Sequence, residues 1–353
     1  MRRNTFLLFA AVTFFMVSCS QADQMPEESF DEMENVIGFS VSTEASDFGA
    51  ATRAEGEFSD ISAIHDAGFG VFASYTGLHT YSESNVSSDF MYNEGVSYNS
   101  GRWTYSPLRY WPNGEGEATD KGTGASPHYV SFFAYAPYND YNDITKYCIP
   151  SFSRAEEKGD PWIMYRLIDK DNLDKQIDLL YADPMLDQTK KAVNENVQFN
   201  FHHALACVGD KVTITVGDVL KANAGAQIIT LTDISVEYTL TEKAKLVLWN
   251  KGKANWQPIV SENITTTRKV VLLENGNETL YDGSDVNPYT GNGKGLFYIP
   301  LDVAGNRQKA EVHVTYTIGS VSVNGIVTIY MSDYTDAFEA GKKLDINITI
   351  DNE

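Results

Sequence analysis

The sequence is short of cysteine and of positive charge. It holds 3 cysteines in 353 residues, and its 27 Lys and Arg residues are outnumbered by 48 Asp and Glu residues, giving a formal net charge of −21. So few cysteines do not indicate a disulfide framework, and Cys148 and Cys207 fall in what we expect to be different domains. An acidic surface repels phosphate backbones, so we expect no nucleic-acid partner.

Long apolar runs are missing beyond the N-terminus. The run at 6–17 follows Arg2 and Arg3 and is shorter than the roughly 20 residues that a membrane-spanning helix needs, so residues 1–19 read as a signal peptide. Residues 16–19, Met-Val-Ser-Cys, resemble a bacterial lipobox with Met in place of the usual Leu. We therefore expect Cys19 to be lipidated. Two or more acyl chains give durable membrane anchoring where one does not.

Common catalytic motifs are also missing, namely the His-Glu-x-x-His helix, the Gly-x-Ser-x-Gly elbow and the phosphate loop. The adjacent His202 and His203 point to opposite faces of a strand, so they cannot bind one ion together, and we expect one of them to pack against the core. Residues 282–287 alternate oxygen ligands but lack the frame of a helical calcium loop, which favours a turn. We expect no enzyme, no catalytic residue, no metal and no cofactor.

An acidic tether, residues 20–35, separates Cys19 from the first expected strand at 36–41. Arg53 is the sole basic residue between Arg3 and His65, so a basic-specific protease meets one target there. Residues 1–53 contribute −5 to the net charge of −21, so cleavage would leave −16 on a chain that begins at Ala54. The alternative is that Arg53 is an ordinary exposed loop residue.

Most of the remaining sequence has the alternation of β-strands. Apolar residues recur at every second position in 197–201, 234–240, 312–318 and 346–350, which predicts half-buried antiparallel strands. Asn324-Gly325 predicts a hairpin within 322–331. Helical candidates are restricted to 155–169 and a short one near 216–222. The class is all-β, with one sandwich at 36–196, of which 36–53 is removable, and a second at 197–353.

The order and spacing of several short blocks resemble the fimbrillin family, the lipoprotein-derived type V pilins of gut and oral anaerobes. The blocks are Thr52-Arg53-Ala54, Phe69-Gly70-Val71-Phe72-Ala73, Tyr110-Trp111-Pro112, residues 130–138, Asp178-Leu179-Leu180-Tyr181-Ala182, residues 197–205 and residues 341–350.

The resemblance implies two transthyretin-like antiparallel β-sandwiches in tandem, export as an outer-membrane lipoprotein precursor and cleavage after Arg53 by an arginine-specific protease. The mature chain would then lie at the cell surface, in a fimbria. Removal of the strand at 36–41 would open a groove that accepts a strand of another pilin subunit, which is donor-strand addition.

We infer the position of the subunit in the fibre from the last expected strand. Family members that build the stalk usually continue into a donor tail, whereas this sequence stops at Glu353, which favours a tip or accessory pilin. One alternative is a stalk pilin that releases 344–350 as its donor. Another is a non-polymerising surface lipoprotein that binds glycans by stacking them on exposed aromatic side chains, the candidates being Tyr75, Tyr92, Trp103, Tyr105 and Trp111. A host or bacterial surface glycan or protein is a further candidate partner, and the ligand-binding residues stay unknown.

Overall fold

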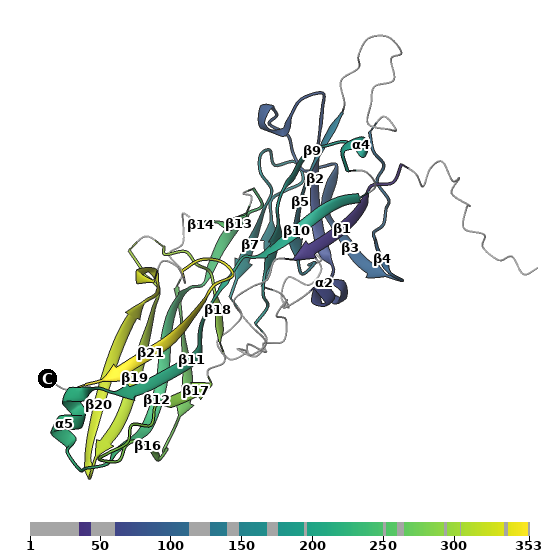
Figure 1. Cartoon of the computed structure of the whole chain (residues 1–353). Coiled ribbons are helices and arrows are strands. Elements are labelled where there is room, and N and C mark those ends of the chain that lie inside the picture. The colour runs from purple at the N-terminus through teal and green to yellow at the C-terminus, as the bar shows by residue number, and fades with distance from the viewer. Residues whose placement is uncertain are drawn as a thin grey trace, which may run out of the picture.

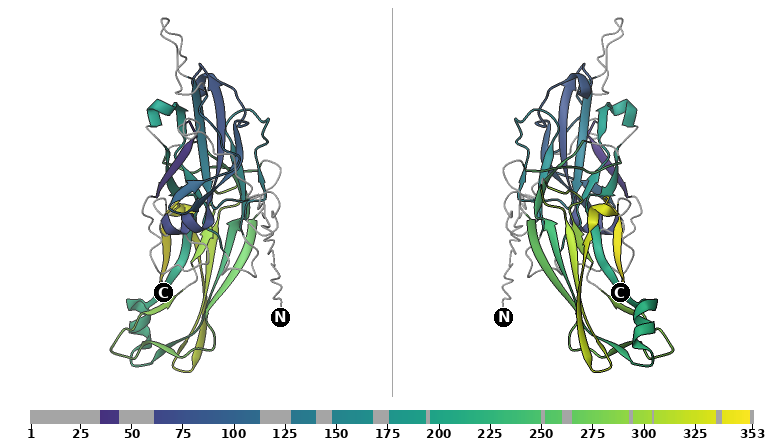
Figure 2. Two further views of the ribbon diagram at one scale, coloured as in Figure 1. Left: turned by 90° about the vertical axis from the view of Figure 1, so that its right-hand side faces the viewer. Right: turned by 90° about the vertical axis from the view of Figure 1, so that its left-hand side faces the viewer.

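The computed structural model describes residues 35–43, 61–112, 128–139, 148–167, 176–193, 196–249, 252–259, 265–292, 295–303, 305–334 and 338–351. In these ranges the protein is mostly β, with 57% of residues in strands and 8% in helices. Strands of the first half of the chain lie at one end of an elongated molecule and strands of the second half at the other (Figures 1 and 2). Cys19, most of the tether, Arg53 and Ala54 lie outside the described residues.

The first half forms an eight-stranded sheet in the order β1-β10-β8-β5-β2-β3-β4, with β9 paired to β5. In the part of the chain that the structure describes, three short helices accompany these strands: α2 (Ile61–Ala67), η1 (Tyr81–Glu83) and α4 (Lys190–Val193). The strands are β1 (Gly38–Thr43), β2 (Phe69–Gly77), β3 (Met91–Asn99), β4 (Arg102–Thr104), β5 (Tyr129–Ala136), β8 (Leu180–Ala182), β9 (Met185–Gln188) and β10 (Asn196–His203).

The second half forms two sheets. In one, β11 (Ala206–Val216) pairs with β17 (Tyr289–Asn292), β18 (Leu296–Tyr298) and β21 (Lys343–Ile350). The other has the order β15-β12-β19-β20, with β16 paired to β12. Its strands are β12 (Ile229–Thr241), β15 (Thr265–Leu273), β16 (Glu278–Tyr281), β19 (Lys309–Ile318) and β20 (Val321–Tyr330), and the helices beside them are α5 (Asp218–Ala224) and η4 (Met331–Asp333).

A fourth sheet, in the order β14-β13-β7-β6, joins the two halves. It consists of β6 (Ser151–Phe152), β7 (Trp162–Arg166), β13 (Lys243–Val247) and β14 (Asn255–Gln257), and Ile163 pairs with Leu246 across it. β7, which precedes residue 196, therefore forms backbone hydrogen bonds with β13, which follows it. A domain division at that residue stays a prediction.

The centre of the first-half sheet, represented by β5, is buried on both faces. Along β5, Phe132 and Phe133 point to opposite faces because successive side chains of a strand alternate. Phe132 joins a cluster confined to the first half, and Phe133 joins a larger cluster that runs through the bridging sheet into the second half. Burial on both sides explains why β5 reads as a nearly continuous apolar run instead of an alternating one.

The alternating segments are strands, as predicted, but two edge strands run in the opposite sense to the prediction. β1 pairs with β10 in parallel, and β21 pairs with β11 in parallel, whereas the sequence led us to expect antiparallel strands. The connections explain this, because long stretches of chain separate the members of each pair and parallel strands need such crossovers.

The predicted hairpin at Asn324-Gly325 is wrong. Both residues lie inside β20, opposite Thr315 and Val314 of β19. The chain reverses between Ile318 and Val321, at Gly319, whose φ of +57° suits glycine. A turn at this point gives ten consecutive residue pairs in register, which a turn at 324–325 would break.

The helix predicted at 155–169 is wrong, and the short one near 216–222 is confirmed as α5. Gly159 has a φ of +104° and Pro161 follows it, so the helical pattern is broken there. From Trp162 the chain instead continues as β7, where pairing with β13 satisfies its backbone.

Candidate functional site

The most informative local structure is the slot that holds β1. On one side β1 pairs with β10, with Phe39 beside Val197 and Val41 beside Phe199. On the other side the residues just before β1 bond to the segment that follows β4: Ile37 N donates to Arg109 O at 2.9 Å, and Trp111 N donates to Asn35 O at 3.0 Å. The strand is thus held from both sides.

From Ile37, which directly precedes β1, and along β1 itself, side chains alternate between the core and the outward face. Ile37 and Phe39 are 0% and 5% exposed, and the Phe39 ring packs at 5.5 to 6.1 Å between centroids against four other rings. These rings belong to Phe69, Tyr105, Phe132 and Phe199. Full burial of a side chain such as Phe contributes about 1.5–3 kcal/mol.

The outward residues of β1 are hydroxylic. Ser40 Oγ donates to Gln198 Oε1 at 2.7 Å, and Ser42 Oγ donates to Asn200 Oδ1 at 3.1 Å. Ser40 and Ser42 are only half-buried on this outward face, so water competes for the same groups and these bonds contribute little. The apolar inner face therefore holds β1 in place.

Tyr105 connects the slot to β1 through its hydroxyl, which donates to Ile37 O at 2.8 Å. Burial raises the pKa of Tyr105 to about 12, so the hydroxyl stays protonated and remains a donor at neutral pH. Sequence reasoning proposed Tyr105 as an exposed platform, but its side chain is 9% exposed and belongs to the core. No sequence signal marks this bond, because Ile37 lies 68 residues away.

The other proposed platform residues divide between core and surface. Trp111 is 4% exposed, so it is a core residue. Tyr92 is half-buried, and its hydroxyl donates to Ser153 O at 2.8 Å. Trp103 is half-buried against Phe69, while Tyr75 is 39% exposed and contacts His128. The structure does not bring these five side chains together on one surface.

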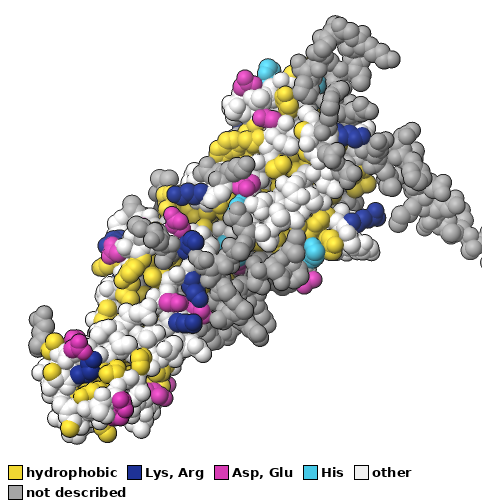
Figure 3. Space-filling view, viewed as in Figure 1, with side chains coloured by type: hydrophobic (Ala, Val, Ile, Leu, Met, Phe, Trp, Pro, Cys, Tyr) yellow, Lys and Arg dark blue, Asp and Glu magenta, His cyan; other side chains and the backbone are white. Residues whose placement is uncertain are grey.

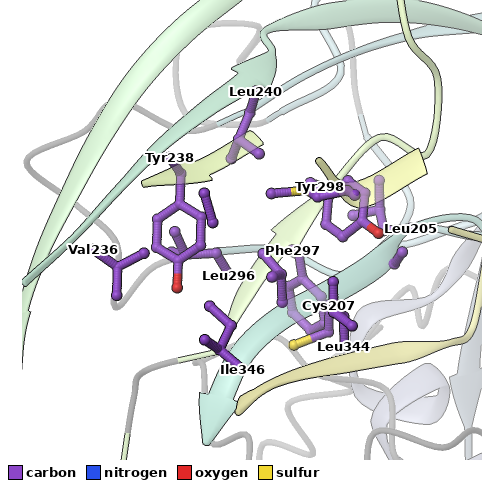
Figure 4. Close-up of a cluster of buried hydrophobic side chains, with 14 of the residues drawn as sticks. Leu205, Cys207, Val236, Tyr238, Leu240, Leu296, Phe297, Tyr298, Leu344 and Ile346 are labelled. Carbon is purple, nitrogen blue, oxygen red and sulfur yellow. The ribbon is translucent and has the colours of Figure 1, made fainter. Parts of the chain in front are cut away.

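A parallel arrangement recurs at β21. Leu344, Ile346, Ile348 and Ile350 are between 1% and 9% exposed, and the close-up shows Leu344 and Ile346 pointing among the core side chains of β11, β12 and β18 (Figure 4). The end of β21 is also fixed, because Asp351 Oδ1 accepts a hydrogen bond from Leu220 N of α5 at 2.6 Å. β21 is therefore an integral part of its sheet.

His202 and His203 do point apart, but each contacts a carboxylate. His203 Nδ1 lies 2.6 Å from Asp178 Oδ2, and His202 Nε2 lies 3.1 Å from Asp183 Oδ2. Both acids flank β8, the antiparallel neighbour of β10. Both side chains are 8% exposed, so the expectation that one of them packs against the core is confirmed. The carboxylates supply the polar partners that buried imidazoles need.

The remaining candidates show no reactive arrangement. Residue Asp282 accepts hydrogen bonds from Ser284 N and Asp285 N at 3.0 and 2.7 Å, which is a turn as predicted. Cys148 and Cys207 are buried, and no disulfide joins them. In the described ranges no group of three or more His, Cys, Asp or Glu residues is placed to hold a metal ion, and no helix there is long and apolar enough to span a membrane.

These features define a mostly β protein in which two edge strands, distant in sequence from their neighbours, lie parallel to consecutive strands of the core. The chain belongs to the Fimbrillin-like family, whose model matches residues 52–353. The resemblance seen in the sequence is thereby confirmed. The match begins one residue before Arg53 and leaves β1 outside.

Two known proteins illustrate the likeness. The chain is 29% identical over 250 residues to the fimbrium subunit Fim1C of Phocaeicola vulgatus, which covers 70% of this chain and 58% of that protein. The chain thus spans less than two thirds of the length of this relative. Its fold is similar to the crystal structure of a fimbrial protein from Bacteroides vulgatus, with a TM-score of 0.59, 19% identity and coverage of 89% and 95% of the two chains.

Proposed function

We propose that this protein is a structural and adhesive subunit of a cell-surface fimbria, in which a strand of a neighbouring subunit takes the place of β1. The single observation that carries the proposal is the slot of β1: an apolar strand at the edge of the sheet, held by β10 and by residues 105–111. An extended strand that enters such a slot gains main-chain hydrogen bonds, and its alternate side chains fix the register.

Family membership supports this proposal. The Fimbrillin-like family is a structural, non-enzymatic family, and the relative Fim1C is described as a fimbrium subunit. In this proposal the chain forms two transthyretin-like sandwiches in tandem, divided near residue 196. It is exported with a lipid on Cys19, anchored in the outer membrane as a precursor and then cut by an arginine-specific protease between Arg53 and Ala54.

The structure of β21 bears on the position of the subunit in the fibre. A strand that buries four aliphatic side chains in its own core cannot leave without exposing them, so β21 is a poor donor strand. This favours a tip or accessory subunit, which accepts a strand, over a stalk subunit that gives β21 away. This assignment of the position in the fibre, unlike the strand-acceptor proposal itself, rests on the packing of β21.

A peptide experiment tests the slot. The cleaved chain that begins at Ala54 is mixed with a synthetic peptide of residues 35–43, and binding is followed by calorimetry. We expect the peptide to bind and to raise the melting temperature of the cleaved chain. The same peptide with Phe39→Asp is the matched control and should not bind, because it would bury an unpaired carboxylate among four aromatic rings.

Two comparisons sharpen this test. The uncut Arg53→Ala chain, whose slot is filled by β1, should not bind the peptide. Equal binding of both peptides to both chains would contradict the strand-acceptor proposal.

On cells, immunogold labelling should mark fibre ends, while continuous labelling along shafts would show a stalk subunit. A protein that keeps its lipidated N-terminus on cells would instead fit the glycan-binding lipoprotein alternative.

A further inference from the structure

The open edge of β20 is a second surface on which a strand can pair, far from β1. β20 ends the order β15-β12-β19-β20, and among the described strands none pairs with its outer edge. It contains no charged residue and no proline, and its ten pairs with β19 show no bulge. Natural proteins usually protect such edges with charges, prolines or bulges, so an unprotected edge of this length indicates a partner.

Hydrophobic side chains on both faces of β20 are exposed to solvent. Val321, Ile326, Val327 and Tyr330 are 62%, 64%, 39% and 38% exposed. Hydrophobic side chains accordingly reach the surface at the end of the molecule where β20 and α5 lie (Figure 3). The inner residues Val323 and Ile329 pack against the core but remain half-exposed, so the apolar face of the sheet continues past its last strand.

Backbone geometry decides which residues of β20 face outward. The hairpin has two connecting residues, so the closing pair Ile318 and Val321 is hydrogen-bonded, and the odd-numbered residues of β20 direct their N–H and C=O groups to β19. The bond from Met331 N to Gln308 O at 3.1 Å continues this pattern. The outward N–H and C=O groups therefore belong to the even-numbered residues: Ser322, Asn324, Ile326, Thr328 and Tyr330.

We propose that a second copy of this chain pairs its β20 antiparallel to the first, about a two-fold axis at Ile326. In an antiparallel ladder, residues with outward-directed groups must face one another. The register that pairs Ile326 with Ile326 is the one that also pairs all the other even-numbered residues, Asn324 with Thr328 and Ser322 with Tyr330.

The side chains in this register are self-complementary. On the outer face an apolar pair at the axis is flanked by polar pairs. On the inner face Val323 lies opposite Ile329, and Gly325 lies opposite Val327, so the apolar faces of the two sheets become continuous. Gly325 has open space beside it, since no atom lies within 4 Å of where its Cβ would be. The partially exposed Val327 of the second copy fills that space.

Charge also favours this edge as the meeting point of two acidic molecules. The charged side chains next to β20 neutralise one another: Lys309 pairs with Glu311 at 2.9 Å, and Arg307 pairs with Asp333 while stacking on Tyr330. A chain with a net charge of −21 repels its own copies, but β20 itself carries no charged residue and therefore adds none of that repulsion. Because such pairing is isologous, it closes at two copies and does not propagate.

Sedimentation velocity of the purified chain over a range of concentrations tests the proposal. We expect a reversible monomer–dimer equilibrium without larger species. Ile326→Lys should raise the dissociation constant by at least about tenfold, because two ammonium groups would then face each other at the axis. Val271→Lys is the matched control, since Val271 is 56% exposed on β15 at the opposite edge of the same sheet, and it should leave the equilibrium unchanged.

Charge reversal makes the experiment decisive. Ile326→Glu alone should raise the dissociation constant to a similar extent, while a mixture of Ile326→Lys and Ile326→Glu should form heterodimers. Ile326→Cys should give an interchain disulfide under mild oxidation and Val271→Cys should not, because the Cα atoms of a hydrogen-bonded pair lie about 5.5 Å apart, within disulfide range. A parent chain that stays monomeric, or a dimer that Ile326→Lys leaves intact, overturns the proposal. Unchanged melting temperatures show that the variants fold.

Discussion

The ring of Phe39 stacks on the ring of Phe199 at 5.7 Å between centroids, across the parallel pairing of β1 and β10. The two residues belong to segments that lie far apart in the sequence, yet their rings belong to one aromatic cluster. Phe39 of β1 therefore contributes one ring to an aromatic core whose other rings come from the rest of the first half. Any strand that replaces β1 must bring an apolar group of similar size to this point.

Replacement of Phe39 should therefore destabilise the uncut chain strongly. We expect Phe39→Ala to lower the free energy of unfolding by about 3–5 kcal/mol, because it leaves a cavity among four rings. Ser40→Ala, on the outward face of the same strand, should change it by less than about 0.5 kcal/mol. Urea unfolding of the parent and both variants measures the difference. Equal small effects would show that β1 is only loosely attached.

The junction between β1 and the rest of the sheet should be the first site of proteolysis. Limited trypsin treatment of the uncut chain should give a stable product that begins at Ala54, because Arg53 is the sole Lys or Arg residue between Arg3 and His65. N-terminal sequencing identifies the product, and Arg53→Ala is the matched control that should resist this first cut. First cuts at Arg154 or Lys191 would contradict the prediction of an exposed processing site.

The alternation of apolar and polar residues along the sequence predicted many of the strands. The features that it missed depend on pairing between segments that are far apart in the sequence. Alternation located β10, β12, β19 and β21, since each has one face in the core. The parallel direction of β1 and β21 could not be read from alternation, which is the same in both directions.

The misplaced turn and the missed hydrogen bond have similar causes. Asn324-Gly325 carries the stronger local turn signal, but the ten-residue register of β19 and β20 favours a turn at Gly319. The hydroxyl of Tyr105 has its partner at Ile37, and an aromatic residue in the sequence does not reveal such a contact. Cys19, Arg53 and Ala54 lie outside the described residues and remain predictions from sequence.

Export should place a lipid on Cys19. In cells that produce the full chain, metabolic labelling with an acyl-chain probe should tag the protein, and Cys19→Ala should abolish the label. The physical reason is that the cysteine follows a short apolar run and a small residue, in the pattern of a lipoprotein signal. The same label on both chains would mean that the lipid is elsewhere or that the signal is an ordinary one.

If β21 stays in its own sheet, its inner residues should matter to stability as core residues do. Ile346→Ala should lower the free energy of unfolding by about 2–5 kcal/mol, because its side chain is 1% exposed. Asn347→Ala, one residue further on the exposed face, should have little effect. Chemical unfolding of both variants tests this. A negligible effect of Ile346→Ala would indicate that β21 is free to act as a donor strand.

The buried thiol of Cys148 should be unreactive in the folded protein. Burial raises its pKa to about 11, so only about one molecule in a thousand carries the thiolate at pH 8. Iodoacetamide should therefore modify Cys148 only after unfolding, as peptide mapping would show.

The same buried thiol makes stability depend on pH. The unfolded thiol loses its proton near its ordinary pKa of about 9, so the unfolded state binds fewer protons than the folded state between pH 9 and 11. The free energy of unfolding therefore falls as the pH rises through that window. Cys148→Ala should reduce this loss by about 1 kcal/mol per pH unit. In the labelling experiment, rapid modification of Cys148 by iodoacetamide in the native chain at pH 8 would show that the thiol is accessible and would contradict its burial.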